Sequence, residues 1–234
     1  MLDDALRVVP FAGELRRNIK TARVSQDLYD DLSADPADWR VALAAEARGR
    51  ADSPAPVISR PFDYGSVITY SFDASHWHAT RFSDGAGYGV WYGSLELETT
   101  VFETVYHWHR FLMDSYAAED RVIVGERRVF DVRCEAALVD LRGAEQRYPG
   151  LRDRRSYAFT HQVGRSLQGA GFPGLLVVSA RCDGVNAALF KPEPLSAVRH
   201  KTYLTYRCHP AEDRVRVERA PGRRWLEIAP STLY

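Results

Sequence analysis

Short runs of aromatic and β-branched residues, interrupted by two longer segments of helical periodicity, fill most of this 234-residue chain. Such runs, bounded by Gly, Pro and Asp, predict strands. A doubly wound parallel sheet requires strands and helices to alternate strictly, and here they do not. The sequence therefore predicts an α+β fold with mixed or antiparallel sheets and flanking helices. The predicted strands are 66–72, 89–93, 122–132, 137–141, 175–179, 201–208 and 214–219.

Two segments predict helices because their apolar residues recur every three or four positions. The first is 96–113, and the second is 157–168, which a glycine-rich stretch ends. The stripe of the first helix consists of Leu97, Val101, Val105, Trp108 and Leu112.

The first fifty residues have a different character. Residues 25–32 and 36–48 predict short helices, the second with Asp35 as its cap and Pro36 in its first turn. An Asp-Ser-Pro-Ala-Pro stretch follows at 52–56 and indicates a boundary. We therefore predict a helical N-terminal extension over 1–52 and a main domain over 53–234.

Composition excludes several classes of protein. With 45% hydrophobic and 26% charged residues the chain is not intrinsically disordered. Basic and acidic residues both total 31, so no overall basic footprint for nucleic acid exists. No apolar run approaches the length of a membrane span, and no signal-peptide pattern opens the chain. Three cysteines without a Cys-x-x-Cys pair indicate reduced thiols. We expect a soluble cytoplasmic protein without direct membrane or nucleic-acid contacts.

Several familiar motifs are missing or incomplete. Gly85, Gly87 and Gly89 have the spacing of a dinucleotide loop but run into a predicted strand, which favours a hairpin or flexible loop. The sequence contains neither a Gly-x-Ser-x-Gly elbow nor a Walker loop.

Two His-x-His pairs are candidate metal ligands. His107 and His109 lie in a predicted helix, where this spacing separates side chains by about 200°. His76 and His78 could converge on a strand, but no third ligand lies near them in sequence. We therefore predict no metal site.

Three charged residues are better candidates. Glu103 points away from the main apolar stripe of its helix, yet Phe102 and Tyr106 form a second apolar strip beside it. A carboxylate on a largely buried helix is a candidate site residue. Arg60 and Arg81 both lie among aromatic residues and glycine, a setting suited to gripping a phosphate or carboxylate beside a flat ring.

In this order, the segments resemble the RES domain, which is named for its Arg, Glu and Ser. The resemblance runs from about residue 57 to 207, and Tyr92 precedes Glu103 by eleven positions, counting along the printed sequence. Arg60 is followed by Pro, and Arg81 is flanked by Thr and Phe, which leaves open which arginine has the principal role. The matching pieces are Arg60-Pro-Phe-Asp-Tyr-Gly, Arg81-Phe-Ser-Asp-Gly, the stretch from Gly89 through Tyr92 and Glu103 to His107, and 174–190 with Ser179 and Asn186.

The resemblance implies a toxin of a bacterial toxin–antitoxin pair. Such toxins have an ADP-ribosyltransferase-like fold and degrade NAD by hydrolysis or phosphorolysis; NAD is a substrate, and no prosthetic group is implied. Their antitoxins carry an Xre-like DNA-binding domain, and the assemblies are multimeric. The resemblance places Glu103, Arg60 and Ser179 in catalysis, and Arg60, Arg81, Tyr92, Ser179 and Asn186 in NAD binding.

Cleavage of the nicotinamide–ribose bond suits these residue types. Its transition state resembles an oxocarbenium ion, which a carboxylate stabilises, and nicotinamide leaves without a general acid. Two alternatives remain open at this point. One is a mono-ADP-ribosyltransferase that modifies a protein, and the other is a non-catalytic module that binds NAD or another ligand.

Overall fold

A computed structural model describes residues 7–20, 65–117 and 120–234 of the chain. All of them belong to one compact unit, which joins Met1–Thr21 to Tyr64–Tyr234. The predicted helices at 25–32 and 36–48, and the boundary at 52, lie outside the described residues. The strands are β1 (Val8–Lys20), β2 (Trp91–Ser94), β3 (Ile123–Asp140), β4 (Gly174–Val178), β5 (Val185–Leu189), β6 (Leu195–Cys208), β7 (Val215–Ala220) and β8 (Arg223–Ile228).

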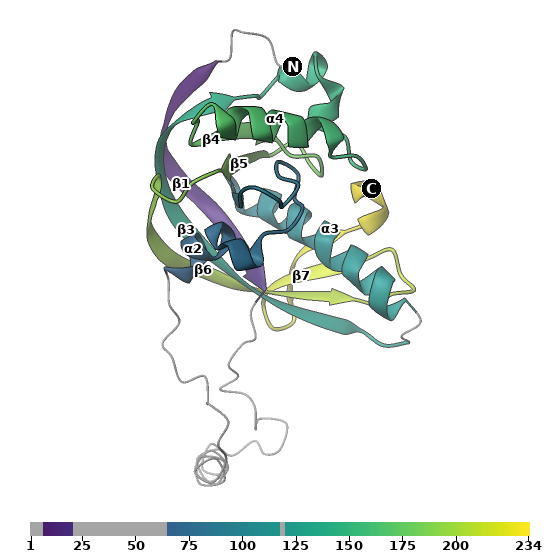
Figure 1. Ribbon diagram of the computed structural model, residues 1–234. Coiled ribbons are helices and arrows are strands. Elements are labelled where there is room, and N and C mark those ends of the chain that lie inside the picture. Colours follow the sequence, from purple (N-terminus) through teal and green to yellow (C-terminus); the bar gives the residue numbers. More distant parts are fainter. Residues whose placement is uncertain (1–6, 21–64, 118–119) are drawn as a thin grey trace, which may run out of the picture. The chain divides into compact units, whose positions relative to one another are not determined.

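The helical elements lie between these strands and after them (Figure 1). The two long helices, α3 and α4, agree closely with the predicted segments 96–113 and 157–168. The helices are α2 (Ser66–Thr69), α3 (Leu97–Tyr116) and α4 (Ala158–Gly169), and the short 3-10 turns are Tyr70–Phe72, Ala74–His76, Ala144–Gln146, Pro149–Leu151 and Pro230–Leu233.

The eight strands form one mixed, mostly antiparallel sheet in the order β1-β2-β5-β4-β3-β6-β7-β8. β1 also pairs with β3 along its whole length, and it meets β2 at Arg16 opposite Ser94. Five strands therefore close into a ring, β1-β2-β5-β4-β3, and β6, β7 and β8 continue the sheet beyond β3. The predicted α+β class is confirmed.

The buried hydrophobic side chains form three clusters, because successive residues of a strand point to opposite faces of the sheet. The ring interior is filled by every second residue of β3, including Phe130, Val132 and Leu138, together with Leu15 and Trp91. Helix α3 packs on β6, β7 and β8, and α4 packs on β3, β4 and β5. The two helices thus cover different parts of the same sheet (Figure 1).

Three predictions of secondary structure were wrong. Residues 8–20, assigned to a helical extension, form β1 of the main sheet. Residues 66–72, predicted as a strand, form α2 and a 3-10 turn, with Val67 packed into the ring interior. The predicted strands 122–132 and 137–141 are one continuous strand, β3, whose register shifts between Val129 and Phe130 and between Asp131 and Arg133.

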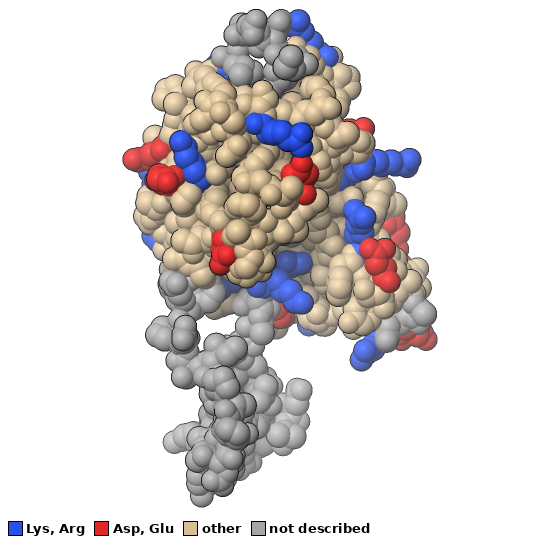
Figure 2. Space-filling model, viewed as in Figure 1, with Lys and Arg blue, Asp and Glu red and all other residues tan. Residues whose placement is uncertain are grey.

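The surface matches the balanced charge of the sequence. On the face in Figure 2, basic and acidic side chains are interspersed over a mostly uncharged surface. No helix among the described residues is long and apolar enough to cross a membrane.

Candidate active site

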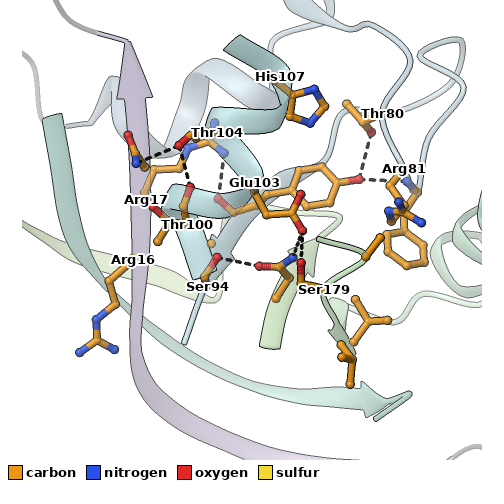
Figure 3. Close-up of a pocket in the computed structure, with 18 of the residues that line it drawn as sticks. Arg16, Arg17, Thr80, Arg81, Ser94, Thr100, Glu103, Thr104, His107 and Ser179 are labelled. Atoms are coloured by element: carbon orange, nitrogen blue, oxygen red, sulfur yellow. Dashed lines mark hydrogen bonds between the residues drawn. The ribbon is translucent and has the colours of Figure 1, made fainter. Parts of the chain in front are cut away.

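A cavity of about 440 Å³ lies between the ring and helix α3 (Figure 3). β1 and β2 contribute one wall, the ends of β4 and β5 contribute another, and α3 contributes a third. Residues 78–82 and Tyr157 complete the lining. The volume is within the range of small-molecule sites, roughly 300–1,000 Å³.

The carboxylate of Glu103 projects from α3 into this cavity and is held by two hydrogen bonds. Ser179 Oγ donates to Glu103 Oε1 at 2.6 Å, and Asn186 Nδ2 donates to the same oxygen at 2.7 Å. Ser94 Oγ donates to Asn186 Oδ1 at 2.6 Å, which fixes the orientation of the amide. Three strand ends therefore hold the carboxylate in one place (Figure 3).

The direction of the Ser179 hydroxyl is set by the backbone that follows it. Ser179 is buried directly after β4, and its Oγ accepts from the N–H groups of Arg181 at 2.9 Å and Cys182 at 3.3 Å. With these two bonds accepted, the hydroxyl proton is free to point at Glu103. Ser179 is thus a hydrogen-bond donor to the carboxylate of Glu103.

Tyr92 holds the loop opposite Glu103. Its hydroxyl donates to Thr80 Oγ1 at 3.0 Å and accepts from the N–H of Phe82 at 2.9 Å. Burial raises the pKa of Tyr92, so the phenol stays neutral at physiological pH. These bonds place residues 80–82 against β2 and thereby position the neighbouring Arg81.

Arg81 extends from this loop along the cavity wall. Its Nη1 donates to the carbonyl oxygen of Asp153 at 3.0 Å and to that of Leu151 at 3.3 Å. The guanidinium carbon lies 4.7 Å from the ring centroid of Tyr157. Both contacts fix the side chain, while Nε and Nη2 have no partner among the described residues and are available to a ligand.

Of the six predicted site residues, the structure brings five around one cavity, and Arg60 lies outside the described residues. Their roles in catalysis and binding stay predictions. The sequence interpretation missed a contribution from β1, where Arg16, Arg17 and Asn18 line the same cavity. Only the pairing of β1 with β2 and β3 brings them there, and no local motif indicated it.

The two histidines of the helical pair diverge as predicted. His107 lines the cavity, whereas His109 is buried and its Nδ1 lies 3.1 Å from the hydroxyl of Tyr234. His78 Nδ1 is within hydrogen-bond distance, 2.9 Å, of the carbonyl oxygen of His76. Within the described ranges, no three His, Cys, Asp or Glu side chains form a cluster suited to a metal ion.

His107 is expected to titrate below the ordinary histidine value of about 6.5. Its ring lines the cavity, where desolvation lowers its pKa, and the Glu103 charge opposes the shift. A carbon-13-detected NMR titration of the histidine rings would measure it. Glu103→Gln should lower the value further, and a midpoint at or above 6.5 would contradict the expectation.

The lowered pKa of His107 also makes the stability of the folded protein depend on pH. The pKa of His107 is lower in the folded protein than in the unfolded chain. At pH values between these two pKa values, the unfolded chain therefore binds more protons than the folded protein. Its contribution to stability is therefore present above about pH 6.5 and is lost as the pH falls through the folded pKa.

The fold and the cavity together define an α+β protein with a single fixed carboxylate and arginines around a ligand-sized pocket. Residues 39–209 match the family model of the RES domain, and the chain belongs to this family. The chain is also similar to a chain in the crystal structure of the M. tuberculosis MbcT–MbcA toxin–antitoxin complex, with 11% identity, a TM-score of 0.44, and coverage of 87% of this chain and 88% of that one. No curated protein matches it.

Proposed function

We propose that this protein degrades NAD by cleaving the bond between nicotinamide and ribose. The observation that supports this most is the single carboxylate of Glu103, fixed by Ser179 and Asn186 inside the cavity. Membership of the RES family supports the same proposal, because the toxins that this chain resembles degrade NAD.

The proposed reaction uses one carboxylate and no general acid. As the C1′–N bond breaks, its electron pair passes to the pyridinium nitrogen, and nicotinamide leaves as a neutral molecule. The positive charge that develops on the ribose lies beside Glu103, which stabilises it electrostatically. An acceptor oxygen then bonds to C1′; when the acceptor is water, it releases one proton.

The cavity offers cations for the diphosphate of NAD. Arg81 presents two uncommitted donor nitrogens from the loop that Tyr92 holds, a geometry suited to phosphate oxygens. Tyr92 contributes by holding that loop, since its hydroxyl is already occupied by Thr80 and Phe82. We expect Tyr92 to position Arg81, in addition to any contact of its ring with the substrate.

We further propose that the protein acts as the toxin of a toxin–antitoxin pair in the cytoplasm. The support is its family, and the partner expected is an antitoxin with an Xre-like DNA-binding domain in a multimeric complex. DNA contacts would then come from the antitoxin, in agreement with the balanced charge of this chain.

The test is to incubate the purified protein with NAD, with and without phosphate, and to follow free nicotinamide. Nicotinamide release in either condition is expected, and the second product, ADP-ribose or ADP-ribose phosphate, identifies the acceptor. In cells, expression without an antitoxin should lower NAD and stop growth. NAD that stays intact both in the purified reaction and in cells would refute the proposal. Transfer of ADP-ribose to cellular proteins would instead favour an ADP-ribosyltransferase.

A further inference from the structure

Behind the wall of the cavity lies a buried arginine that the proposed reaction does not use. Arg181 follows Ser179 by two positions, and only 4% of it is exposed. It is not among the described residues that line the cavity. Its backbone N–H donates to Ser179 Oγ at 2.9 Å. Whatever fixes the side chain of Arg181 therefore also fixes the turn that carries Ser179.

The guanidinium of Arg181 contacts three other segments of the chain. Nη1 donates to the carbonyl oxygen of Leu233 at 2.6 Å, and Nη2 donates to that of Arg154 at 3.1 Å. The guanidinium carbon lies 3.4 Å from the ring centroid of Tyr106 on α3. These contacts tie the turn after β4 to α3, to the segment at Arg154 and to the 3-10 turn Pro230–Leu233.

The Pro230–Leu233 turn is itself anchored, so it offers Arg181 a fixed acceptor. Leu233 is buried in the core cluster of α3, and the turn lies beside this helix (Figure 1). Arg154 adds a second bridge, because its Nε donates to the carbonyl oxygen of Ala180 at 3.0 Å and its Nη1 to that of Thr232 at 2.9 Å. The turn lies outside residues 39–209 of the family match.

A buried guanidinium is costly unless it is hydrogen-bonded, and here two carbonyl oxygens and an aromatic face stabilise it. Tyr106 lies three positions after Glu103, within one turn of the same helix. One side chain thus contacts both elements that carry the hydrogen-bonded pair of Ser179 and Glu103.

We infer that Arg181 is a positioning residue: its side chain ties the turn after β4 to α3, and so keeps the hydroxyl of Ser179 on the carboxylate of Glu103. The inference rests on the proposed function for the reaction that this pair serves. Because a misplacement of about 1 Å can cost roughly 100-fold in rate, loss of this contact should lower the rate of NAD cleavage.

The experiment compares the full chain as wild type, Arg181→Gln, Arg181→Lys and Arg127→Gln. Nicotinamide release gives kcat and KM. The side-chain amide signals of Asn186 in nitrogen-15 NMR report the position of the Glu103 carboxylate without turnover, because Asn186 Nδ2 donates to it. Arg181→Gln should lower kcat roughly 10- to 100-fold with little change in KM, and should shift the Asn186 signals. Arg181→Lys keeps the charge over the ring but not the fork of donors, so it should recover both readouts only in part.

Arg127 is the matched control. Its guanidinium carbon also lies over an aromatic ring, 5.5 Å from the centroid of Tyr206, and its Nε, like that of Arg181, is buried without a partner. It does not line the cavity. Arg127→Gln should lower stability in urea while leaving kcat and the Asn186 signals at their wild-type values.

The inference is overturned if folded Arg181→Gln keeps kcat within about threefold of wild type, or if its Asn186 signals do not move. It is also overturned if Arg127→Gln changes both readouts as much as Arg181→Gln does, since the effect would then be one of general stability. If Arg181→Gln does not fold, Arg181→Lys decides, and wild-type kcat and signals in that variant overturn the inference. If the wild-type protein leaves NAD intact, the proposed cleavage fails, and the Asn186 signals alone decide whether Arg181 positions the pair.

Discussion

Replacing Glu103 with glutamine is expected to lower the rate of NAD cleavage by roughly 100- to 1,000-fold, the usual effect of removing one preorganised electrostatic group. The amide has the same shape as the carboxylate and can still accept the hydrogen bonds of Ser179 and Asn186. What is lost is the negative charge beside the developing oxocarbenium ion. The loss should therefore fall on kcat, with little change in KM or in thermal stability.

The matched control is Glu98→Gln on the same helix. Glu98 is exposed in the first turn of α3, so its removal takes away a carboxylate without touching the cavity. NAD cleavage by this variant should equal that of wild type. Equal rates in Glu103→Gln and wild type, measured as nicotinamide released under saturating NAD, would show that Glu103 is not the stabilising group.

The local sequence pattern was sufficient to predict an element when one face of that element packs on a continuous core. The stripe at Leu97, Val101 and Val105 predicted α3, and its residues pack on β6, β7 and β8. The same periodicity placed Glu103 off this stripe, and the structure places it in the cavity. The hydrogen bonds that orient its carboxylate come from Ser179, directly after β4, and from Asn186 of β5, so no local pattern could define them.

Long-range packing overrode local propensity at 66–72. The β-branched and aromatic residues there favour a strand, but Val67 is buried in the ring interior and its carbonyl oxygen accepts a hydrogen bond from Trp91 Nε1 at 2.9 Å. A short helix satisfies both contacts. This preference depends on residues more than twenty positions away, which the pattern of 66–72 does not contain.

β1 was also not predicted, and its place in the sheet depends on pairing with distant strands. Pro10 argues against a central strand, because proline cannot donate to a second neighbour. In the structure Pro10 pairs with Ala137 of β3, while β1 meets β2 only at Arg16. Pro10 is therefore on a part of β1 with one neighbour, where proline is tolerated. The consequence reaches the site, since β1 brings Arg17 to the cavity.

Gly184→Ala is expected to destabilise the protein by about 1–3 kcal/mol, the usual cost of overpacking, and to lower activity as well. A Cβ at Gly184 would lie 1.8 Å from Thr99 Oγ1, at the start of α3. The carbonyl oxygen of Gly184 accepts from the N–H of Ser179 at 2.8 Å, so a displaced turn would also displace the hydroxyl that holds Glu103. Urea unfolding and nicotinamide release measure the two effects. Gly169→Ala is the control, because its Cβ would meet nothing within 4 Å.

A double variant tests whether the contact between a Cβ at Gly184 and the side chain of Thr99 causes the loss of stability and activity. Thr99→Ala removes Oγ1 and Cγ2, two of the three atoms nearest to a Cβ at Gly184, at 1.8 and 3.0 Å, and keeps the third, the Thr99 Cβ, at 2.9 Å. Alone, Thr99→Ala should be destabilising, because Thr99 is buried and its hydroxyl donates to Glu96. Combined with Gly184→Ala, it should cost less than the two single changes added together, by about 1 kcal/mol or more. Costs that add within about 0.5 kcal/mol would mean that the turn is displaced by something other than Thr99. Recovery of activity together with stability would show that the packing of α3 against the β4–β5 turn keeps Ser179 within hydrogen-bond distance of Glu103.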